Sequence, residues 1–520
     1  MLSTFLKSTL AVAFAAFATA SQPVLAADEA VRQAQKLLIA LGYKIGSADG
    51  VSGKRTEAAV ADAMANYGQT YDGTLSDNEV LLLARVAPSR VTVDFEVAVS
   101  ELNHLHSADI NGDGRLDFVV TAMSDTAEQL GIPCCEVPAN RVPDITPPVP
   151  ILVYSTPEGY ATKPFPPEAK GNRSQAGRFF TAYGKQYFVL AKNGEMGLPS
   201  ENHGEISMVF RITPSEDMAI ETVAEFDGRG VSANVDVADL DGDGQPEIFL
   251  NNYGLISTVT SAGGSVIKTF TSDEKLASTK FTAPIESRKP MNYVSLIDFD
   301  GSGNLDLLVA VEIEKTMDGS VMLAKAPGSY VILDPFVRKT AELDRIYLLP
   351  PFWGNDHAGY SILPITVDGR ILMFEISQQF LGHQGGGFIN DHLDVFEYST
   401  ADKAFTLVTA DVLPKQPRMR DKSSALYLQR ADLDFDGIDE VYRQQYPYEP
   451  QFFEWNGKAF ALTNFPSKDF FKPNWTGTLI YLPDPELKCT RMVTFSQNLG
   501  GNGGQTKTDL RLTSCVPMGD

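Results

Sequence analysis

The sequence contains few of the residue types on which most catalytic centres depend. Six histidines and four cysteines are spread over 520 residues. Neither the Gly-x-Ser-x-Gly turn of serine hydrolases nor the His-Glu-x-x-His helix of zinc peptidases occurs. His104 and His106 would share one face of a strand, but no third zinc ligand accompanies them. We therefore assign no catalytic residue from the sequence.

Positive charge and long apolar runs are scarce as well. The chain has 43 Lys and Arg against 66 Asp and Glu, a formal net charge of −23. An acidic surface argues against nucleic acid and anionic membranes as partners. Beyond residue 26 no stretch reaches 18 apolar residues. We therefore expect a soluble mature chain without a transmembrane segment.

The one long apolar run lies at the N-terminus. Lys7 precedes an apolar stretch over residues 10–20, and residues 24–26 (VLA) offer a small-residue cleavage site. This pattern predicts a secretory signal peptide over residues 1–26, with an uncleaved anchor as the alternative. We expect an exported protein that is periplasmic or associated with the cell wall.

Three helical patterns follow, joined by Asp-Gly turns. Apolar residues recur at helical spacing over residues 31–41 and stop before Gly42. A second helix is expected from about Thr56, and a third ends near Arg85. The sequence therefore predicts a compact three-helix domain over residues 27–88.

This domain resembles the peptidoglycan-binding-like domain family. The resemblance rests on residues 35–43 (QKLLIALGY), 49–60 (DGVSGKRTEAAV) and 72–75 (DGTL). Family members usually carry an aromatic residue and Gln after Ala-Val, where this chain has residues 61–64 (ADAM). The resemblance implies peptidoglycan as a partner, with structural use of the fold as the alternative.

A nine-residue acidic loop occurs four times in the rest of the chain. Side-chain oxygens stand at loop positions 1, 3, 5 and 9, and position 6 is glycine. Such oxygens can converge on one hard cation, and calcium takes six to eight of them. The candidate calcium ligands are Asp109, Asn111, Asp113, Asp117, Asp239, Asp241, Asp243, Glu247, Asp298, Asp300, Ser302, Asp306, Asp432, Asp434, Asp436 and Glu440.

The number of carboxylates ranks the four loops. The loops at 239 and 432 offer four each, the loop at 109 has neutral Asn111, and the loop at 298 has Ser302, a poorer ligand. We expect affinity to fall in the order 239 and 432, then 109, then 298. The loops lack the glutamate that an EF-hand carries at position 12 and are followed by strand patterns. A plain surface turn is the alternative for any single copy.

The spacing of the loops indicates a longer repeat. Successive loops begin 130, 59 and 134 residues apart, so each long gap can hold a further unit. Strand–turn–strand patterns lie at those places, over residues 178–191 and 362–374. A seventh unit would use residues 492–495, the glycines at 500–504 and residues 510–512. Seven units of short strands predict a mainly β, seven-bladed β-propeller.

Residues 93–520 thereby resemble the FG-GAP/VCBS repeat family, the integrin-alpha type of calcium-binding propeller. The acidic loops and the strands after them, such as residues 237–250 (VADLDGDGQPEIFL), carry this resemblance. It implies the fold and bound Ca²⁺, and says almost nothing about activity.

The four cysteines suit an oxidising compartment. Cys489 and Cys515 bracket the last repeat and could join its outer strands. Cross-links from Cys134 or Cys135 to either of them would close the ring as well.

Two functions fit these features. The first is an exported, non-catalytic calcium-binding propeller that binds an unknown protein or glycan, as an adhesion or scaffold module at the bacterial cell wall. The alternative is an exported carbohydrate-active enzyme, of lyase or hydrolase type, on the same fold. If the four acidic loops share one face, binding is expected at the opposite rim, with residues 134–150 and 382–391 as candidates.

Overall fold

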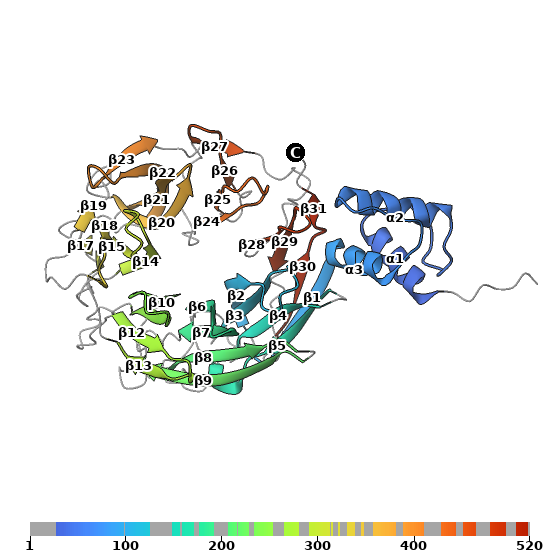
Figure 1. Cartoon of the computed structure of the whole chain (residues 1–520), viewed down its shortest axis with the longest axis horizontal. Coiled ribbons are helices and arrows are strands. Elements are labelled where there is room, and N and C mark those ends of the chain that lie inside the picture. Colours follow the sequence, from blue (N-terminus) through green and yellow to red (C-terminus); the bar gives the residue numbers. More distant parts are fainter. Residues whose placement is uncertain are drawn as a thin grey trace, which may run out of the picture.

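A computed structural model gives the fold as a ring of seven sheets with a small helical domain at its edge (Figure 1). It describes residues 28–97, 99–124, 148–156, 159–170, 176–191, 206–215, 217–227, 233–252, 265–279, 291–311, 314–315, 321–322, 330–337, 345–347, 357–380, 388–409, 428–443, 451–463, 479–495 and 506–517. The signal-peptide prediction for residues 1–26 lies outside these ranges. Within them, no helix has the length and apolar character needed to cross a membrane.

The helical domain contains the three predicted helices. They are α1 (Glu29–Ala40), α2 (Lys54–Asn66) and α3 (Asp77–Val86). The Asp28 side chain caps α1, and Ser76 and Glu79 form a reciprocal capping box at the start of α3. Leu38 and Leu83 lie fully buried in the shared core. Local signals of this kind explain why the helices could be found from sequence.

The first three blades follow one another in the chain, each with its first strand nearest the ring centre (Figure 1). Blade 1 contains β2 (Val99–Ala108), β3 (Asp117–Ser124), β4 (Ile151–Thr156) and β5 (Gly159–Pro164), and a short 3-10 helix (Pro167–Ala169) follows it. Blade 2 contains β6 (Ala176–Ala182), β7 (Lys185–Ala191), β8 (Ile206–Thr213) and β9 (Ala219–Asp227). Blade 3 contains β10 (Ala233–Ala238), β11 (Glu247–Asn252), β12 (Ser265–Phe270) and β13 (Leu276–Ser278).

The next three blades repeat the arrangement. Blade 4 contains β14 (Met291–Ile297), β15 (Asp306–Val311), β18 (Tyr330–Ile332) and β19 (Arg345–Tyr347), with the hairpin β16 (Glu314–Lys315) and β17 (Val321–Met322) between its second and third strands. Blade 5 contains β20 (His357–Val367), β21 (Arg370–Phe380), β22 (Phe388–Ser399) and β23 (Ala404–Thr409). Blade 6 contains β24 (Leu428–Ala431), β25 (Glu440–Arg443), β26 (Gln451–Trp455) and β27 (Phe460–Thr463).

The closing blade joins the two ends of the propeller. Its strands are β28 (Leu479–Asp484), β29 (Cys489–Phe495) and β30 (Thr506–Leu512), with β1 (Ser89–Phe95) from the start of the ring as the outermost strand. β1 and β30 are antiparallel over their whole length, from Ser89 opposite Leu512 to Phe95 opposite Thr506. The ring therefore takes in residues just before position 93, and each end of the propeller holds the other in place.

The seven-bladed fold predicted from the loop spacing is confirmed. The two units inferred within the long gaps are blades 2 and 5, whose first turns carry Gly184 and Gly369. The seventh unit needs a correction. Residues 492–495 and 510–512 belong to its second and third strands, so its first turn lies before Cys489, earlier than the glycines at 500–504. Those glycines lie outside the described residues.

Apolar cores fill the space between neighbouring blades. Between the closing blade and blade 1, Leu482 and Val493 pack with Phe118 and Val153. Further clusters join blades 2 and 3, and blades 5 and 6. Burial between blades rather than within them makes each blade depend on its neighbours.

A disulfide joins Cys489 to Cys515, with the two Cα atoms 5.4 Å apart. Cys489 opens β29, and Cys515 precedes the short strand β31 (Val516–Pro517), which pairs with β29. The expected pairing is present, but it ties the C-terminal segment to the second strand of the blade instead of joining outer strands. Cys134 and Cys135 lie outside the described residues.

Candidate functional site

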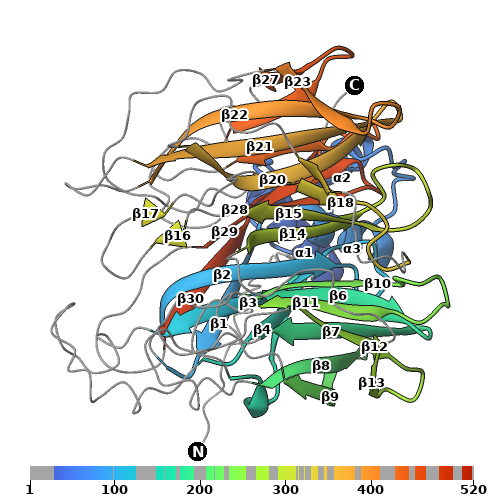
Figure 2. The same ribbon diagram turned by 90° about the vertical axis from the view of Figure 1, so that its left-hand side faces the viewer.

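The four acidic loops join the first and second strands of blades 1, 3, 4 and 6. Because equivalent strands run in the same direction in every blade, all four loops emerge on one face of the ring, as the repeat spacing predicts. Short hairpin turns gather at this side, on the right of Figure 2. We call it the loop face. The candidate rim segments 134–147 and 382–387 lie outside the described residues.

Backbone amides shape each loop around its first carboxylate. In the loop of blade 3, Asp239 Oδ1 accepts hydrogen bonds from the amides of Gly242 and Asp243 at 2.8 and 3.1 Å. Its Oδ2 accepts from Gly244 at 2.8 Å. Gly242 and Gly244 have φ of 73° and 82°, which glycine adopts at little cost. The sequence pattern of acids and glycines thus fixes a tight turn lined with oxygen atoms.

The carboxylate at position 9 is the buried anchor of every loop. Asp117, Glu247, Asp306 and Glu440 are at most 2% exposed. Each accepts a hydrogen bond from the amide at position 2, at 3.0, 2.9, 2.7 and 2.6 Å respectively. The carboxylate at position 9, at the start of the second strand, therefore fixes the loop by a hydrogen bond and also offers an oxygen to a cation.

Burial is the main electrostatic cost of these anchors. Together with the charges of Asp434 and Asp432, it raises the pKa of Glu440 to about 8. Burial likewise raises the pKa of Asp306 to about 6 and that of Asp117 to about 7. A divalent cation between the carboxylates would supply the positive charge that keeps such groups ionised.

Three of the loops bring their carboxylates together in a way that fits calcium. The groups with ligand oxygens within 4.8 Å of one another are Asp239, Asp241 and Glu247; Asp298, Asp300 and Asp306; and Asp432, Asp434 and Glu440. Asp432 Oδ1 is buried and has no hydrogen-bond partner among the described residues. Converging carboxylate oxygens, one of them without a hydrogen-bond donor, match the ligands that Ca²⁺ prefers.

The loop of blade 1 differs, because an arginine lies within it. Arg115 is 8% exposed, and its Nη2 lies 2.7 Å from Asp113 Oδ2. The Ser155 hydroxyl donates to the same oxygen at 2.7 Å, and the Asn111 amide donates to Ser155. Although burial acts in the opposite direction, these bonds lower the pKa of Asp113. Position 3 of this loop is Asn111, so the loop lacks one of the three carboxylates that converge at positions 1, 3 and 9 of the other loops.

The loop of blade 6 carries local strain at its fourth position. Phe435 has φ of 66°, where the other three loops have glycine. A residue with a side chain in this region costs about 1–2 kcal/mol. We expect Phe435→Gly to stabilise the chain by about 1 kcal/mol in urea unfolding. Gly437→Ala, at φ 91° in the same loop, is the matched control and is expected to destabilise; a loss of stability in both variants would contradict the assignment of strain.

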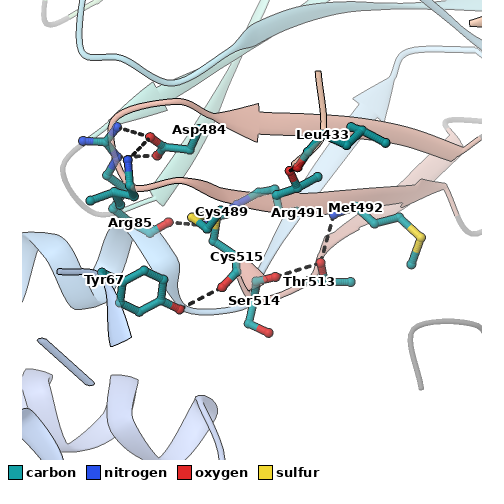
Figure 3. The surroundings of a disulfide bond; sticks show 12 residues. Tyr67, Arg85, Leu433, Asp484, Cys489, Arg491, Met492, Thr513, Ser514 and Cys515 are labelled. Carbon is teal, nitrogen blue, oxygen red and sulfur yellow. Dashed lines mark hydrogen bonds and ion pairs between the residues drawn. A yellow bond between two sulfur atoms is a disulfide. The ribbon is translucent and has the colours of Figure 1, made fainter. Parts of the chain in front are cut away.

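In the closing blade, an arginine of the helical domain occupies the place of the acidic loop. The turn between β28 and β29 carries Asp484 and Glu486. Arg85 of α3 lies 2.6 and 2.7 Å from the two oxygens of Asp484 (Figure 3). It also lies 2.7 Å from Glu486 Oε2. Two carboxylates that could have faced a metal therefore hold the helical domain against the ring.

The disulfide forms part of the same contact (Figure 3). The Cys515 amide donates to the Val86 carbonyl at 2.9 Å, and the Tyr67 hydroxyl donates to the Cys515 carbonyl at 2.8 Å. Val86, Leu487 and both cysteines are buried together. The guanidinium of Arg491 donates to the Arg85 carbonyl. The contact combines apolar burial, hydrogen bonds and ion pairs, so the two domains form one unit.

A cavity of about 580 Å³ lies beside this contact, between the helical domain and the loop face. Residues of α2, α3 and the segment between them line one side, including Met64, Thr70 and Leu81. Asn111 and Ser155 of blade 1 line the other side. Sequence reasoning placed binding on the opposite rim and missed this cavity, because its two walls lie far apart in the chain.

The two neighbouring histidines noted in the sequence belong to the first strand of blade 1. His104 and His106 both lie on β2, where the register shifts between His104 and Ser107. The surrounding protein, which desolvates the imidazole, and the charge of Arg178 lower the pKa of His106 to about 4. In the described part of the chain, no converging group of metal-ligating side chains includes a histidine.

Comparison with known proteins identifies the helical domain. The sequence model of the family described as "Putative peptidoglycan binding domain" matches residues 27–80. No curated protein matches the chain. Similar solved structures include Sqt1 of Saccharomyces cerevisiae, at 9% identity, covering 82% of this chain and 98% of that one, with a TM-score of 0.38. An alpha-L-arabinanase of Penicillium chrysogenum, complexed with arabinobiose, has 9% identity, coverage of 81% and 98%, and a TM-score of 0.37.

The periplasmic gluconolactonase PpgL of Pseudomonas aeruginosa is also similar, at 12% identity, with coverage of 82% and 100% and a TM-score of 0.30. Similarities of this size carry no argument about activity. Residues 27–80 are therefore a domain of the peptidoglycan-binding type, joined to a seven-bladed β-propeller.

Proposed function

We propose that this chain is an exported, non-catalytic, calcium-binding propeller that acts as a binding or scaffold module at the bacterial cell wall. The match of residues 27–80 to the peptidoglycan-binding family carries this proposal. The ion pairs of Arg85 support it, because they connect that domain rigidly to the ring. The propeller is of the FG-GAP/VCBS type, and its own partner is a protein or glycan.

The wall association is tested with purified sacculi. The whole chain without residues 1–26 is expected to sediment with sacculi, and unlabelled peptidoglycan fragments are expected to compete. Failure to sediment would remove the proposal. The alternative, a carbohydrate-active enzyme, predicts release of soluble sugar fragments during the same incubation, and release that tracks the purified chain would favour it.

Calcium is proposed for the loops of blades 3, 4 and 6. Each gathers three carboxylates within 4.8 Å, and oxygen ligands at a glycine-containing turn suit calcium better than magnesium. The ion would hold the first turn of its blade closed and neutralise the buried anchor carboxylate. Its place is structural, since the three converging carboxylates of each site come from a single loop.

Because Arg115 lies in the loop of blade 1, the number of calcium ions bound per chain can be predicted and tested. We expect calorimetry to find three calcium ions per chain, and four in Arg115→Ala, because the substitution frees Asp113. This reverses the order of affinity expected from the sequence for the loops at 109 and 298. Arg90→Ala is the control, since Arg90 is paired with Asp509 on the outer strands. Four ions in the unmodified chain would show that Arg115 does not displace calcium.

A further inference from the structure

The cavity beside the domain contact has the size and position of a ligand site. Its volume of about 580 Å³ lies within the usual range for small-molecule pockets, which often occur between domains. The lining residues from Met64 to Glu79 belong to the segment that matches the peptidoglycan-binding family. The remaining wall comes from the end of α3 and from the propeller. Neither domain forms this cavity alone.

The walls combine apolar surface with uncharged hydrogen-bonding groups. Leu81 is 43% exposed on α3, in the same wall as Leu82. Gln69, Thr70 and Asn78 add amide and hydroxyl groups from the helical domain, and Asn111 and Ser155 add them from blade 1. A sugar ring has an apolar face and a rim of hydroxyl groups, so a lining of this kind suits an oligosaccharide.

The charges in the cavity argue against an anionic ligand. Three carboxylates and two guanidinium groups line it. Arg85 is held by Asp484 and Glu486, and Arg115 is held by Asp113. Both cations are therefore already neutralised by partners in the described structure. An acidic polymer would meet a surface with excess negative charge, whereas a neutral glycan would not.

We propose that this cavity binds a short, uncharged stretch of the glycan strand of peptidoglycan, and that both domains contribute to the site. The inference rests on the proposed wall association and adds the place and the ligand class. It also gives a reason for the arginine in the loop of blade 1. With Arg115 in place of a metal ion, hydrogen bonds between the loop and β4 hold Asn111 and Ser155 in the wall of the cavity.

Whole-chain variants test the site, with sacculi and an N-acetylglucosamine tetrasaccharide as probes. Thr70→Trp fills the cavity from the helical domain, and Val51→Trp is its control, because Val51 is 44% exposed and lies outside the lining. Leu81→Ala is matched by Ile39→Ala at an exposed site on α1. Asn111→Ala tests the propeller wall. The melting midpoint of each variant confirms that it folds.

We expect Thr70→Trp to weaken binding of both probes by at least about tenfold, and Leu81→Ala and Asn111→Ala by about fivefold. The two controls are expected to bind like the unmodified chain. Unchanged binding in Thr70→Trp and Asn111→Ala would overturn this inference and leave the wall association standing. Loss confined to Thr70→Trp and Leu81→Ala would place the site on the helical domain alone. Binding to sacculi without binding to the tetrasaccharide would overturn the ligand class, and no binding to sacculi would remove both proposals.

Discussion

Removal of calcium is expected to lower the stability of the propeller more than any single substitution. A site saturated at 100 times its dissociation constant stabilises the folded chain by about 2.7 kcal/mol, and three such loops give about 8 kcal/mol. The carboxylates that gather in the empty loops also repel one another. The measurement is the melting midpoint of the whole chain in calcium and in excess chelator, followed by calorimetry.

The individual loops provide the controls for this experiment. Asp241→Ala removes one of three converging carboxylates, whereas Ser302→Ala removes a hydroxyl that donates to Asp334 outside the converging group. Asp241→Ala is expected to destabilise more in calcium, and the two variants are expected to become similar in chelator. Magnesium is expected to restore little stability. An unchanged melt in chelator, or the reverse order of the two variants, would contradict calcium binding by these loops.

Substitution of Arg85 is expected to separate the helical domain from the ring. Arg85→Ala leaves the carboxylate of Asp484, which is only 6% exposed, without its bidentate partner. Loss of one partner of a buried ion pair costs about 3–5 kcal/mol. We therefore expect a loss of this size in urea unfolding, and faster proteolysis between α3 and β1.

Arg90→Ala is the matched control, because the Arg90 side chain is 58% exposed and 3.4 Å from Asp509. Exposed pairs contribute less than about 1 kcal/mol, so this variant is expected to resemble the unmodified chain. Equal effects of the two substitutions would show that the Arg85 contact contributes no more than a surface pair. Asp484→Asn is expected to be milder than Arg85→Ala, since it leaves no buried carboxylate unpaired.

The loop face of the ring therefore carries two kinds of contact. In blades 3, 4 and 6 its loops each gather three carboxylates. In blade 1 and the closing blade, the equivalent turns hold Arg115 and Arg85. These two blades are neighbours in the closed ring, and the helical domain lies against both. An arginine side chain therefore occupies the acidic turn in each of the two blades that contact the helical domain.

The sequence by itself determined the helices, the acidic loops and the number of blades. Each of these depends on residues close together in the chain. Capping at Ser76 and the turn around Gly244 are set within a few positions. The blade count followed from the loop spacing, because units of equal length must fill the gaps. Blades 2 and 5 could be placed in this way although they carry no acidic loop.

Only the tertiary structure decided how the helical domain contacts the ring where the closing blade meets blade 1. Arg85 and Asp484 are 399 positions apart, and no local pattern marks them as a pair. Ring closure by β1 brings them together, and the same closure creates the cavity between α3 and blade 1. Arg115 stands at a loop position that places no demand on its side chain, so its turn toward Asp113 could not be read from spacing. Side-chain direction and long-range closure are set by packing, which is why neither the Arg85 contact nor the cavity beside it could be predicted from the sequence.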